Sequence, residues 1–404
     1  MTRPASRLGW LDALRGPAAL AVALHHAAWG FIPGVWGEVD RRIDMGTWGV
    51  FVFFMVSGYI IPASLERRGD VRSFWIGRVF RLLPLILAAA VPALVLAAYG
   101  LHHALDPNLD RRALPLVMLG NLTMSQELLG LPAIHGVMWT LSYEMAFYLI
   151  VVGLFTVRQV HRSAGIAMGL AVLAVPLGLL LPRAVVNGGA GLAAAILGLA
   201  VVAVILVTAA GGRARNAAAI AGAVLGLALV VLGSRIGAWQ GLTMLAMMFA
   251  GTAVYRAEQG RIRPRTAVAA VLVVLACGFL AKDDPGWGPA IVAAAAFFGA
   301  MYALRRRAFP RWLTHLGVIS FSIYLLHPLL LGNTPHLAVY FLVLLLLSHL
   351  TYRFVEAPAQ RLGRRVAARW AQPTCTGGRR SASGSASRST SRVSGGMSPP
   401  PNTR

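Results

Sequence analysis

Arg15 and His26 lie eleven residues apart in an otherwise apolar stretch near the start of the chain. On an α-helix this spacing places both side chains on one face, about 16 Å apart along the axis, and His25 points about 80° away. Ionisable groups inside a membrane helix are costly and typically face a bundle interior or a water-filled cavity. There an arginine can bind an anionic group and an imidazole can act as a general base. The alternative is that Arg15 reaches the inner membrane surface and His26 makes one interhelical hydrogen bond.

Glu144 lies in the apolar stretch 138–149, which reads MWTLSYEMAFYL. We expect this stretch to run inward across the membrane with Glu144 in its first part, whereas His26 lies in the last part of an outward-running helix. Both side chains are therefore predicted in the outer half of the membrane, close together. A carboxylate beside an imidazole fixes the tautomer and raises the basicity of the ring, which makes it a general base for a hydroxyl. The alternative is a structural ion pair between Glu144 and an arginine.

Arg78 and Arg81 are three residues apart, so they share one helix face just inside the membrane. Two arginines on one face suit a phosphate or pyrophosphate ligand, whereas ordinary anchoring at the inner surface is the alternative. A serine-glycine pair at 57–58 predicts a close approach of two helices. Tyr324 and His327 also share one face, where packing is the alternative to chemistry.

Membrane helices must position these side chains. Of the 404 residues, 57% are hydrophobic and 13% are charged, whereas a soluble domain has about 25% charged residues. Long apolar runs indicate membrane-spanning helices, and no sustained apolar–polar alternation suggests a β-barrel. We therefore predict an all-α fold, a polytopic transmembrane helical bundle of about 10–12 spanning helices. The apolar segments are 8–30, 46–63, 83–101, 138–156, 164–181, 190–210, 217–233, 239–255, 266–281, 289–304, 316–331 and 336–352.

Arginine-rich links alternate with poorer ones along the chain, which predicts that the basic links and both termini are cytoplasmic. The same bias accounts for the net charge of +23 without a nucleic-acid partner. The link 102–137 is predicted to be an outer cap or a re-entrant segment. Residues 1–370 are predicted to form one membrane-embedded domain, and the Ser/Gly/Arg/Pro-rich residues 371–404 a disordered cytoplasmic tail.

The two cysteines, Cys277 and Cys375, lack the spacing of metal ligands. We therefore predict neither a metal site nor a disulfide framework. The first apolar segment carries Arg15 and has no cleavage site of small residues, so we expect a retained helix rather than a signal peptide.

Six motifs follow one another along the chain. They are Asp12 and Arg15 with His26; Phe53 to Tyr59, which includes Ser57; Arg78-x-x-Arg81-x-x-Pro84; Trp139-x-Leu141-x-x-Glu144-x-x-Phe147-Tyr148; Ser320-x-Ser322-x-Tyr324-x-x-His327; and Glu356-x-Pro358. In this order they resemble the acyltransferase-3 family of integral membrane acyltransferases, which O-acetylate lipopolysaccharide, peptidoglycan, Nod factors and glycosylated macrolides. The resemblance covers residues 8 to about 365, and the six ordered motifs are more specific than any one alone.

The resemblance implies roles for the ionisable residues. His26 would be the catalytic base, and Arg15 on the same helix would position the donor. Arg78 and Arg81 would hold the phosphates of acyl-coenzyme A, and Glu144 would support the histidine or the acceptor.

The implied activity is transfer of an acyl group, expected to be acetyl, from acyl-CoA to a hydroxyl of a carbohydrate or glycosylated acceptor in a bacterial plasma membrane. Acyl-CoA would be a co-substrate, with no permanently bound cofactor. Ser57 and Tyr324 are candidates to contact the donor and stabilise the oxyanion. Direct transfer and a route through an acylated His26 both stay open. A transporter or flippase with an intramembrane His/Glu relay is the alternative interpretation.

Overall fold

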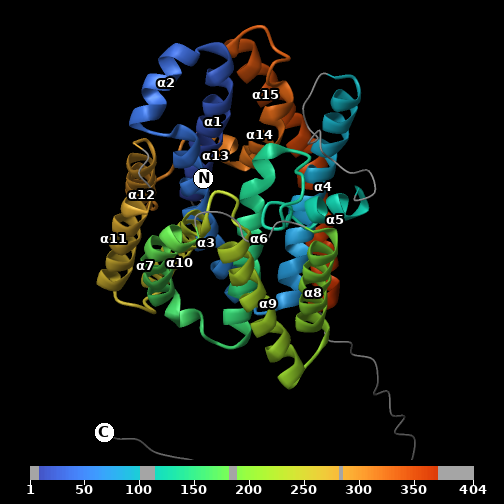
Figure 1. Cartoon of the computed structure of the whole chain (residues 1–404), viewed down its shortest axis with the longest axis vertical. Helices are drawn as coiled ribbons and strands as arrows, with labels where there is room; N and C mark the ends of the chain where they lie inside the picture. Colours follow the sequence, from blue (N-terminus) through green and yellow to red (C-terminus); the bar gives the residue numbers. More distant parts are fainter. Residues whose placement is uncertain (1–8, 101–113, 182–188, 282–284, 372–404) are drawn as a thin grey trace, which may run out of the picture.

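The chain folds as a bundle of helices around a central group that includes α3, α6 and α10 (Figure 1). The computed structural model describes residues 9–100, 114–181, 189–281 and 285–371, and every regular element in these ranges is helical. The α-helices are α1 (Gly9–Phe31), α2 (Pro33–Arg42), α3 (Met45–Arg68), α4 (Val71–Ala98), α5 (Leu114–Leu122), α6 (Trp139–Thr156), α7 (Ser163–Leu180), α8 (Ala190–Ala209), α9 (Gly212–Gly233), α10 (Ala238–Glu258), α11 (Pro264–Leu280), α12 (Trp287–Ala303), α13 (Arg311–Val318), α14 (Ser320–Leu326), α15 (Leu337–Thr351) and α16 (Ala357–Ala371). Shorter 3-10 turns are Gly136–Met138, Val160–Arg162 and His327–Leu330, and Tyr352–Glu356 is a π-helical turn.

Seven helical segments of the described chain are long and apolar enough to cross a membrane. An eighth is added if α13 and Ser320–Leu330, which are bent by 52°, form one broken span. In the described residues, each of the twelve apolar segments predicted from the sequence is mostly helical, which confirms the all-α, multi-span fold. The seven segments are Met45–Arg68, Val71–Leu96, Gly136–Thr156, Val160–Leu180, Ala190–Ala209, Gly212–Gly233 and Leu337–Trp370.

The number of spans that meet this requirement is below the predicted 10–12, because four helices fall short of it. α1 contains Asp12, Arg15, His25 and His26, which lower its hydropathy. α10 is buried along nearly its whole length, so it needs no lipid-facing apolar surface, and α11 and α12 have only 17 residues each. The cytoplasmic position of both termini stays a prediction, and the tail from residue 372 onward lies outside the described residues.

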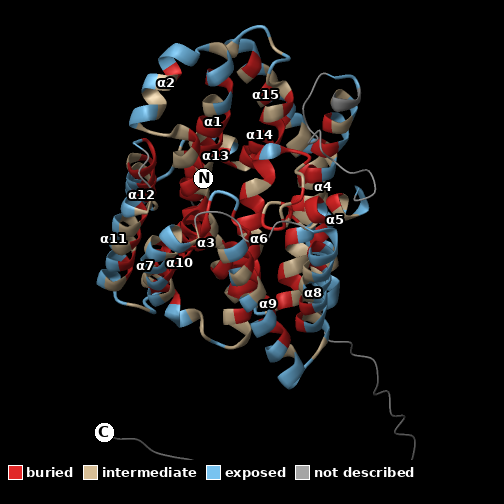
Figure 2. Cartoon of the chain, viewed as in Figure 1, coloured by how far each residue is buried: buried red, intermediate tan, exposed pale blue. Residues whose placement is uncertain are grey.

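The outer surface of the bundle is apolar, as contact with lipid requires. Figure 2 shows buried residues gathered at the centre of the bundle and exposed ones on the outer faces of the peripheral helices. Leu179 on α7, Leu272 on α11 and Leu342 on α15 are among the large exposed apolar side chains. Polar side chains that avoid lipid can therefore lie at the centre of the bundle, where they form hydrogen bonds and ion pairs with one another.

α3 and α10 are in contact backbone to backbone. A Cβ added at Gly58 would lie 1.8 Å from the carbonyl oxygen of Met248, and one added at Gly251 would lie 2.2 Å from that of Met55. The Thr252 hydroxyl donates a hydrogen bond to the carbonyl of Gly58 at 2.7 Å. Small residues allow membrane helices to approach this closely, so the close approach predicted at this glycine is confirmed.

Substitution of Gly58 by alanine is expected to lower the thermal stability of the protein, because its methyl group would overlap the Met248 carbonyl. Overpacking of this kind costs about 1–3 kcal/mol. Gly299→Ala on α12 is the matched control, since a Cβ there meets no atom within 4 Å, and helical Gly→Ala changes at open sites are neutral or stabilising. Unfolding followed by tryptophan fluorescence in lipid nanodiscs measures both, and equal melting temperatures for G58A and the wild type would contradict the contact.

The described part of the link between α4 and α6 packs against the bundle through part of its surface. α5 packs against α8, and the Asn121 side chain accepts a hydrogen bond from the Ile134 amide at 2.9 Å. Gln126 is fully buried and donates to the carbonyl of Met138 at 3.0 Å. Polar loop groups at membrane depth need such internal partners. Residues 101–113 of the predicted cap lie outside the described residues.

Candidate active site

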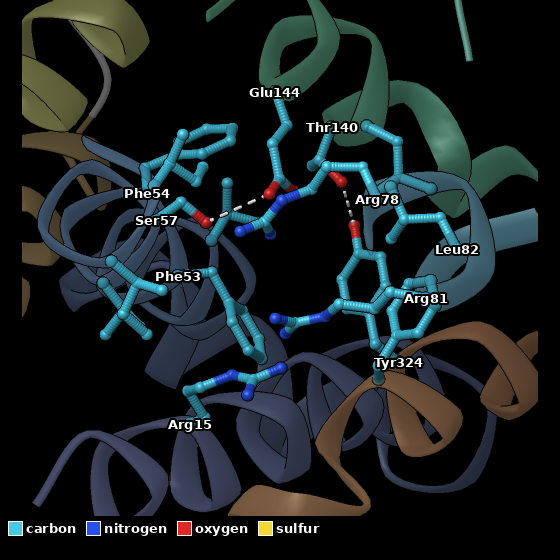
Figure 3. Close-up of a pocket in the computed structure, with 16 residues that line it drawn as sticks. Arg15, Phe53, Phe54, Ser57, Arg78, Arg81, Leu82, Thr140, Glu144 and Tyr324 are labelled. Carbon is cyan, nitrogen blue, oxygen red and sulfur yellow. Dashed lines mark hydrogen bonds between the residues drawn. The ribbon is translucent and has the colours of Figure 1, made fainter. Parts of the chain in front are cut away.

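The side chains singled out from the sequence meet in a polar pocket between α1, α3, α4, α6 and α14 (Figure 3). Together with the open solvent that adjoins it, the pocket contains about 730 Å³ of empty space. Of the seven predicted site residues, only His26 is absent from its wall, and Thr140 adds a further hydroxyl. The predicted residues in the wall are Arg15, Ser57, Arg78, Arg81, Glu144 and Tyr324.

Three arginines give this pocket an excess of positive charge. Arg78 and Arg81 point into it from consecutive turns of α4 (Figure 3), and the Arg78 guanidinium lies 5.4 Å from the centroid of the Tyr148 ring. The ion pairs among the described residues include neither of them, and Arg15 has only a 4.0 Å contact with Asp12. Three guanidinium groups beside the single carboxylate of Glu144, none of them in an ion pair closer than 4.0 Å among the described residues, favour an anionic ligand in this partly closed space. Their inward direction supports the binding interpretation over surface anchoring.

Glu144 is the carboxylate of the pocket. The Tyr148 hydroxyl donates to its Oε1 at 2.5 Å, and the Ser57 hydroxyl donates to the same oxygen at 3.4 Å. Thr140, Glu144 and Tyr148 follow one another at intervals of four along α6, so they form a row on one helix face. This spacing is visible in the sequence, but neither Thr140 nor Tyr148 was predicted as a site residue.

A second cavity adjoins the polar pocket. This basic cavity lies between α1, α3, α4 and α16 and, together with the open solvent that adjoins it, contains about 1500 Å³ of empty space. Because Arg15, Arg78 and Arg81 line both spaces, the two meet at these three side chains. They form a path from the arginine-rich face of the protein into the bundle. The basic residues that line the cavity are Arg15, Arg67, Arg68, Arg78, Arg81 and Arg364.

The predicted contact between His26 and Glu144 is wrong. No hydrogen bond or ion pair joins them within the described ranges. The neighbour of His26 is His327, and their ring centroids are 5.0 Å apart. Depth counted along two ideal helices missed this neighbour because α14 ends at Leu326 and the chain continues as a 3-10 turn that contacts α1. The catalytic roles of His26 and Glu144 stay predictions.

Both imidazoles of this pair have an Nε2 lone pair. His26 Nδ1 lies 2.9 Å from the carbonyl oxygen of Val22, and His327 Nδ1 lies 2.8 Å from that of Tyr324. Since a carbonyl only accepts, the proton of each neutral ring is on Nδ1. His327 is fully buried and its Nε2 has no hydrogen-bond partner among the described residues, whereas His26 is exposed. The pair can therefore accept a proton from a group that approaches His26.

Tyr324 connects the polar pocket to the histidine pair. It lines the pocket, and its ring centroid is 6.0 Å from that of His327. Its hydroxyl donates to the carbonyl of Val137 at 2.8 Å and is 2.7 Å from Thr140 Oγ1. A series of ring contacts thus runs from Tyr324 on the pocket wall through His327 to His26. The sequence placed Tyr324 and His327 on one helix face, but the partnership of His327 with α1 depends on the fold.

The relatives found by comparison with known proteins are named as acyltransferases or O-acetyltransferases. Acyltransferase MdmB of Streptomyces mycarofaciens is 31% identical over 150 residues, which are 35% of this chain and 38% of MdmB. A Staphylococcus aureus (strain COL) protein named as an O-acetyltransferase is 25% identical over 196 residues, 44% of this chain and 30% of that protein. A Bacillus subtilis (strain 168) protein named as a peptidoglycan O-acetyltransferase is 28% identical over 176 residues, 39% of this chain and 26% of that protein.

The chain therefore spans less than two fifths of the length of these relatives. No solved structure shows a significant match. The family model described as an acyltransferase domain matches residues 8–355, a range that contains every residue of the polar pocket and the histidine pair. On the strength of that match over most of its length, the chain belongs to the acyltransferase-3 family.

Proposed function

We propose that the protein is an O-acyltransferase that moves an acyl group, in the simplest case acetyl, from acyl-CoA to a hydroxyl of a carbohydrate or glycosylated acceptor. The observation that carries this proposal is the sharing of Arg15, Arg78 and Arg81 by the polar pocket and the basic cavity. An anionic coenzyme finds charge-assisted hydrogen-bond donors there. The names of two relatives, which specify O-acetyltransferases, support the acetyl group and the hydroxyl acceptor.

In this proposal the donor approaches from the arginine-rich face. Its phosphates bind where the two cavities meet, and its pantetheine arm extends into the polar pocket. Arg15 and His26 are about 16 Å apart along α1, a separation that suits a long ligand with an anionic end and a reactive thioester at the other. The thioester would lie beside Tyr324, whose ring contacts that of His327.

His26 is the proposed general base. Its Nε2 takes the proton of the acceptor hydroxyl as the hydroxyl oxygen attacks the thioester carbonyl carbon. The carbon–sulfur bond then breaks, the ester forms, and the proton passes from His26 to the departing thiolate of CoA. His327 supplies a second Nε2 lone pair beside this proton, so the two rings can share it between the two halves of the reaction.

Ser57 and Tyr324 are the proposed contacts for the donor and the oxyanion, and their hydrogen bonds support Ser57 as the better candidate for the oxyanion. The only hydroxyl proton of Tyr324 is donated to the Val137 carbonyl at 2.8 Å. The Ser57 proton is held only by a 3.4 Å contact with Glu144, so Ser57 can turn toward a developing negative charge more easily. Glu144 in turn offsets part of the arginine charge and orients Ser57.

Acyl transfer by purified protein in lipid nanodiscs tests the proposal. With acetyl-CoA and a panel of muramyl glycans, lipopolysaccharide fragments and glycosylated macrolides, at least one acceptor is expected to gain one acetyl group by mass spectrometry, with release of free CoA thiol. Acetyl-CoA alone should release little thiol. Proton-driven uptake of a glycoside by proteoliposomes, with no acyl transfer to any acceptor, would contradict the proposal and favour a transporter.

A further inference from the structure

One histidine and two aspartates converge beside the histidine pair, at the end of the bundle formed by α2 and its neighbours. His25 comes from α1, Asp40 from α2, and Asp44 is the N-cap residue of α3. His25 Nδ1 lies 3.2 Å from Asp40 Oδ1 and 3.7 Å from Asp44 Oδ1. One donor atom from each of the three residues lies within 4.8 Å of the others. Three different elements thus bring one nitrogen and two oxygens to one point.

The separations fit a shared cation. Bond lengths of about 2.0–2.2 Å from Zn²⁺ to nitrogen and oxygen, at tetrahedral angles, place neighbouring donor atoms about 3.3–3.6 Å apart. The two measured separations from His25 Nδ1 are 3.2 and 3.7 Å. Three protein ligands also leave a fourth position for water, as in many zinc sites. An imidazole with two carboxylates is a donor set that divalent transition metals accept.

The surroundings hold one ligand in place. The Thr47 amide donates to Asp44 Oδ1 at 2.8 Å, and the Thr47 hydroxyl donates to Oδ2 at 2.5 Å. Each carboxylate oxygen has a second acceptor direction, so these bonds orient Asp44 without blocking it. The three side chains are between 19% and 28% exposed, so a cation would be partly shielded yet reachable from solvent.

We propose that His25, Asp40 and Asp44 bind one divalent cation of the zinc class. The cation joins α1, α2 and the start of α3, and it lies next to His26, since the ring centroids of His25 and His26 are 5.2 Å apart. Its effect is to fix the end of α1 that carries His26. This inference does not depend on the proposed acyl transfer. The competing arrangement is a protonated His25 that pairs with the two carboxylates and binds no metal.

Metal titration of the tag-free, EDTA-treated protein tests the site. His315 and His349 form an exposed pair, 3.1 Å between ring nitrogens, which can bind Zn²⁺ by itself, so the titrations use an H315A/H349A background. Mass spectrometry of the metal content is expected to give one Zn²⁺ per chain. Zn²⁺ is also expected to raise the melting temperature, because it binds the folded state.

H25Q and D40N in that background are expected to weaken Zn²⁺ binding at least tenfold and to remove the rise in melting temperature. E38Q is the matched control on α2, because Glu38 pairs with exposed Arg41 outside the cluster, and it should bind Zn²⁺ like its parent. If D40N fails to fold, H25Q decides alone. Substoichiometric binding by the parent, or unchanged Zn²⁺ affinity in folded H25Q, would overturn the proposal, and a lower melting temperature of H25Q without metal dependence would indicate the ion pair.

Discussion

Substitution of His26 by alanine is expected to reduce acyl transfer by about 10²–10⁴-fold, the usual contribution of a general base. The loss should appear in kcat rather than in the KM for acyl-CoA, because His26 lies outside the polar pocket in which the donor is proposed to bind. The neighbouring His327 should give a smaller loss, since its buried Nε2 reaches the proton only through His26. Single-turnover assays of CoA release and acceptor acylation measure both variants.

The double variant H26A/H327A sharpens this prediction. If the two rings act as one proton-handling unit, the double variant should be hardly slower than H26A alone, because the effects of groups that act together are not additive. His161→Ala, which removes an exposed histidine between α6 and α7, is the control and should retain full activity. Wild-type turnover by folded H26A would refute the assignment of His26 as the base. If the loss in the double variant equals the product of the two single losses, the two histidines act independently.

Substitution of Arg78 and Arg81 by glutamine, singly and together, is expected to raise the KM for acyl-CoA. A hydrogen bond to a charged group is worth about 1.5–3 kcal/mol, so each change should weaken donor binding by roughly 10-fold to 100-fold. The kcat at saturating donor should change less, because the arginines contact the proposed phosphates and not the reacting carbon. Steady-state kinetics with varied acyl-CoA and fixed acceptor measures the split.

Arg72→Gln on the same helix is the matched control. Arg72 hydrogen-bonds to the carbonyl of Thr208 at 3.0 Å and lies over the ring of Trp370, and it lines neither cavity. Its KM should equal that of the wild type. If R72Q and R81Q raised the KM for acyl-CoA equally, the total positive charge at this face would account for donor binding. That result would contradict the proposal that the donor binds in the polar pocket.

Local spacing predicted much of the site. Arg78 and Arg81 share a helix face by their separation alone, and the structure keeps both on the pocket wall. Glu144 was recognisable from local sequence as well, because it is the single carboxylate in the apolar stretch 138–149. The meeting of these residues with Arg15 was implied only by the family motifs, because it depends on the packing of α1 against the rest of the bundle.

The site contacts that the sequence did not predict occur where regular helices are interrupted. The predicted neighbour of His26 was Glu144, whereas the 3-10 turn after α14 brings His327 there instead. The convergence of His25 with Asp40 and Asp44 is equally hidden, because α2 folds back between two longer helices at a point that no periodicity marks. Helix counting assigns depth along one axis, but it does not reveal which helices are neighbours.

The direct contact between the α3 and α10 backbones restricts how the protein can open. No side chain separates these helices at Gly58 and Gly251, so we expect them to move as one unit. Any widening of the polar pocket during turnover is therefore expected at the walls formed by the other helices, among them α4, which carries Arg78 and Arg81. A coenzyme that binds Arg78 and Arg81 on α4 would then change the width of the polar pocket as it binds and as it leaves.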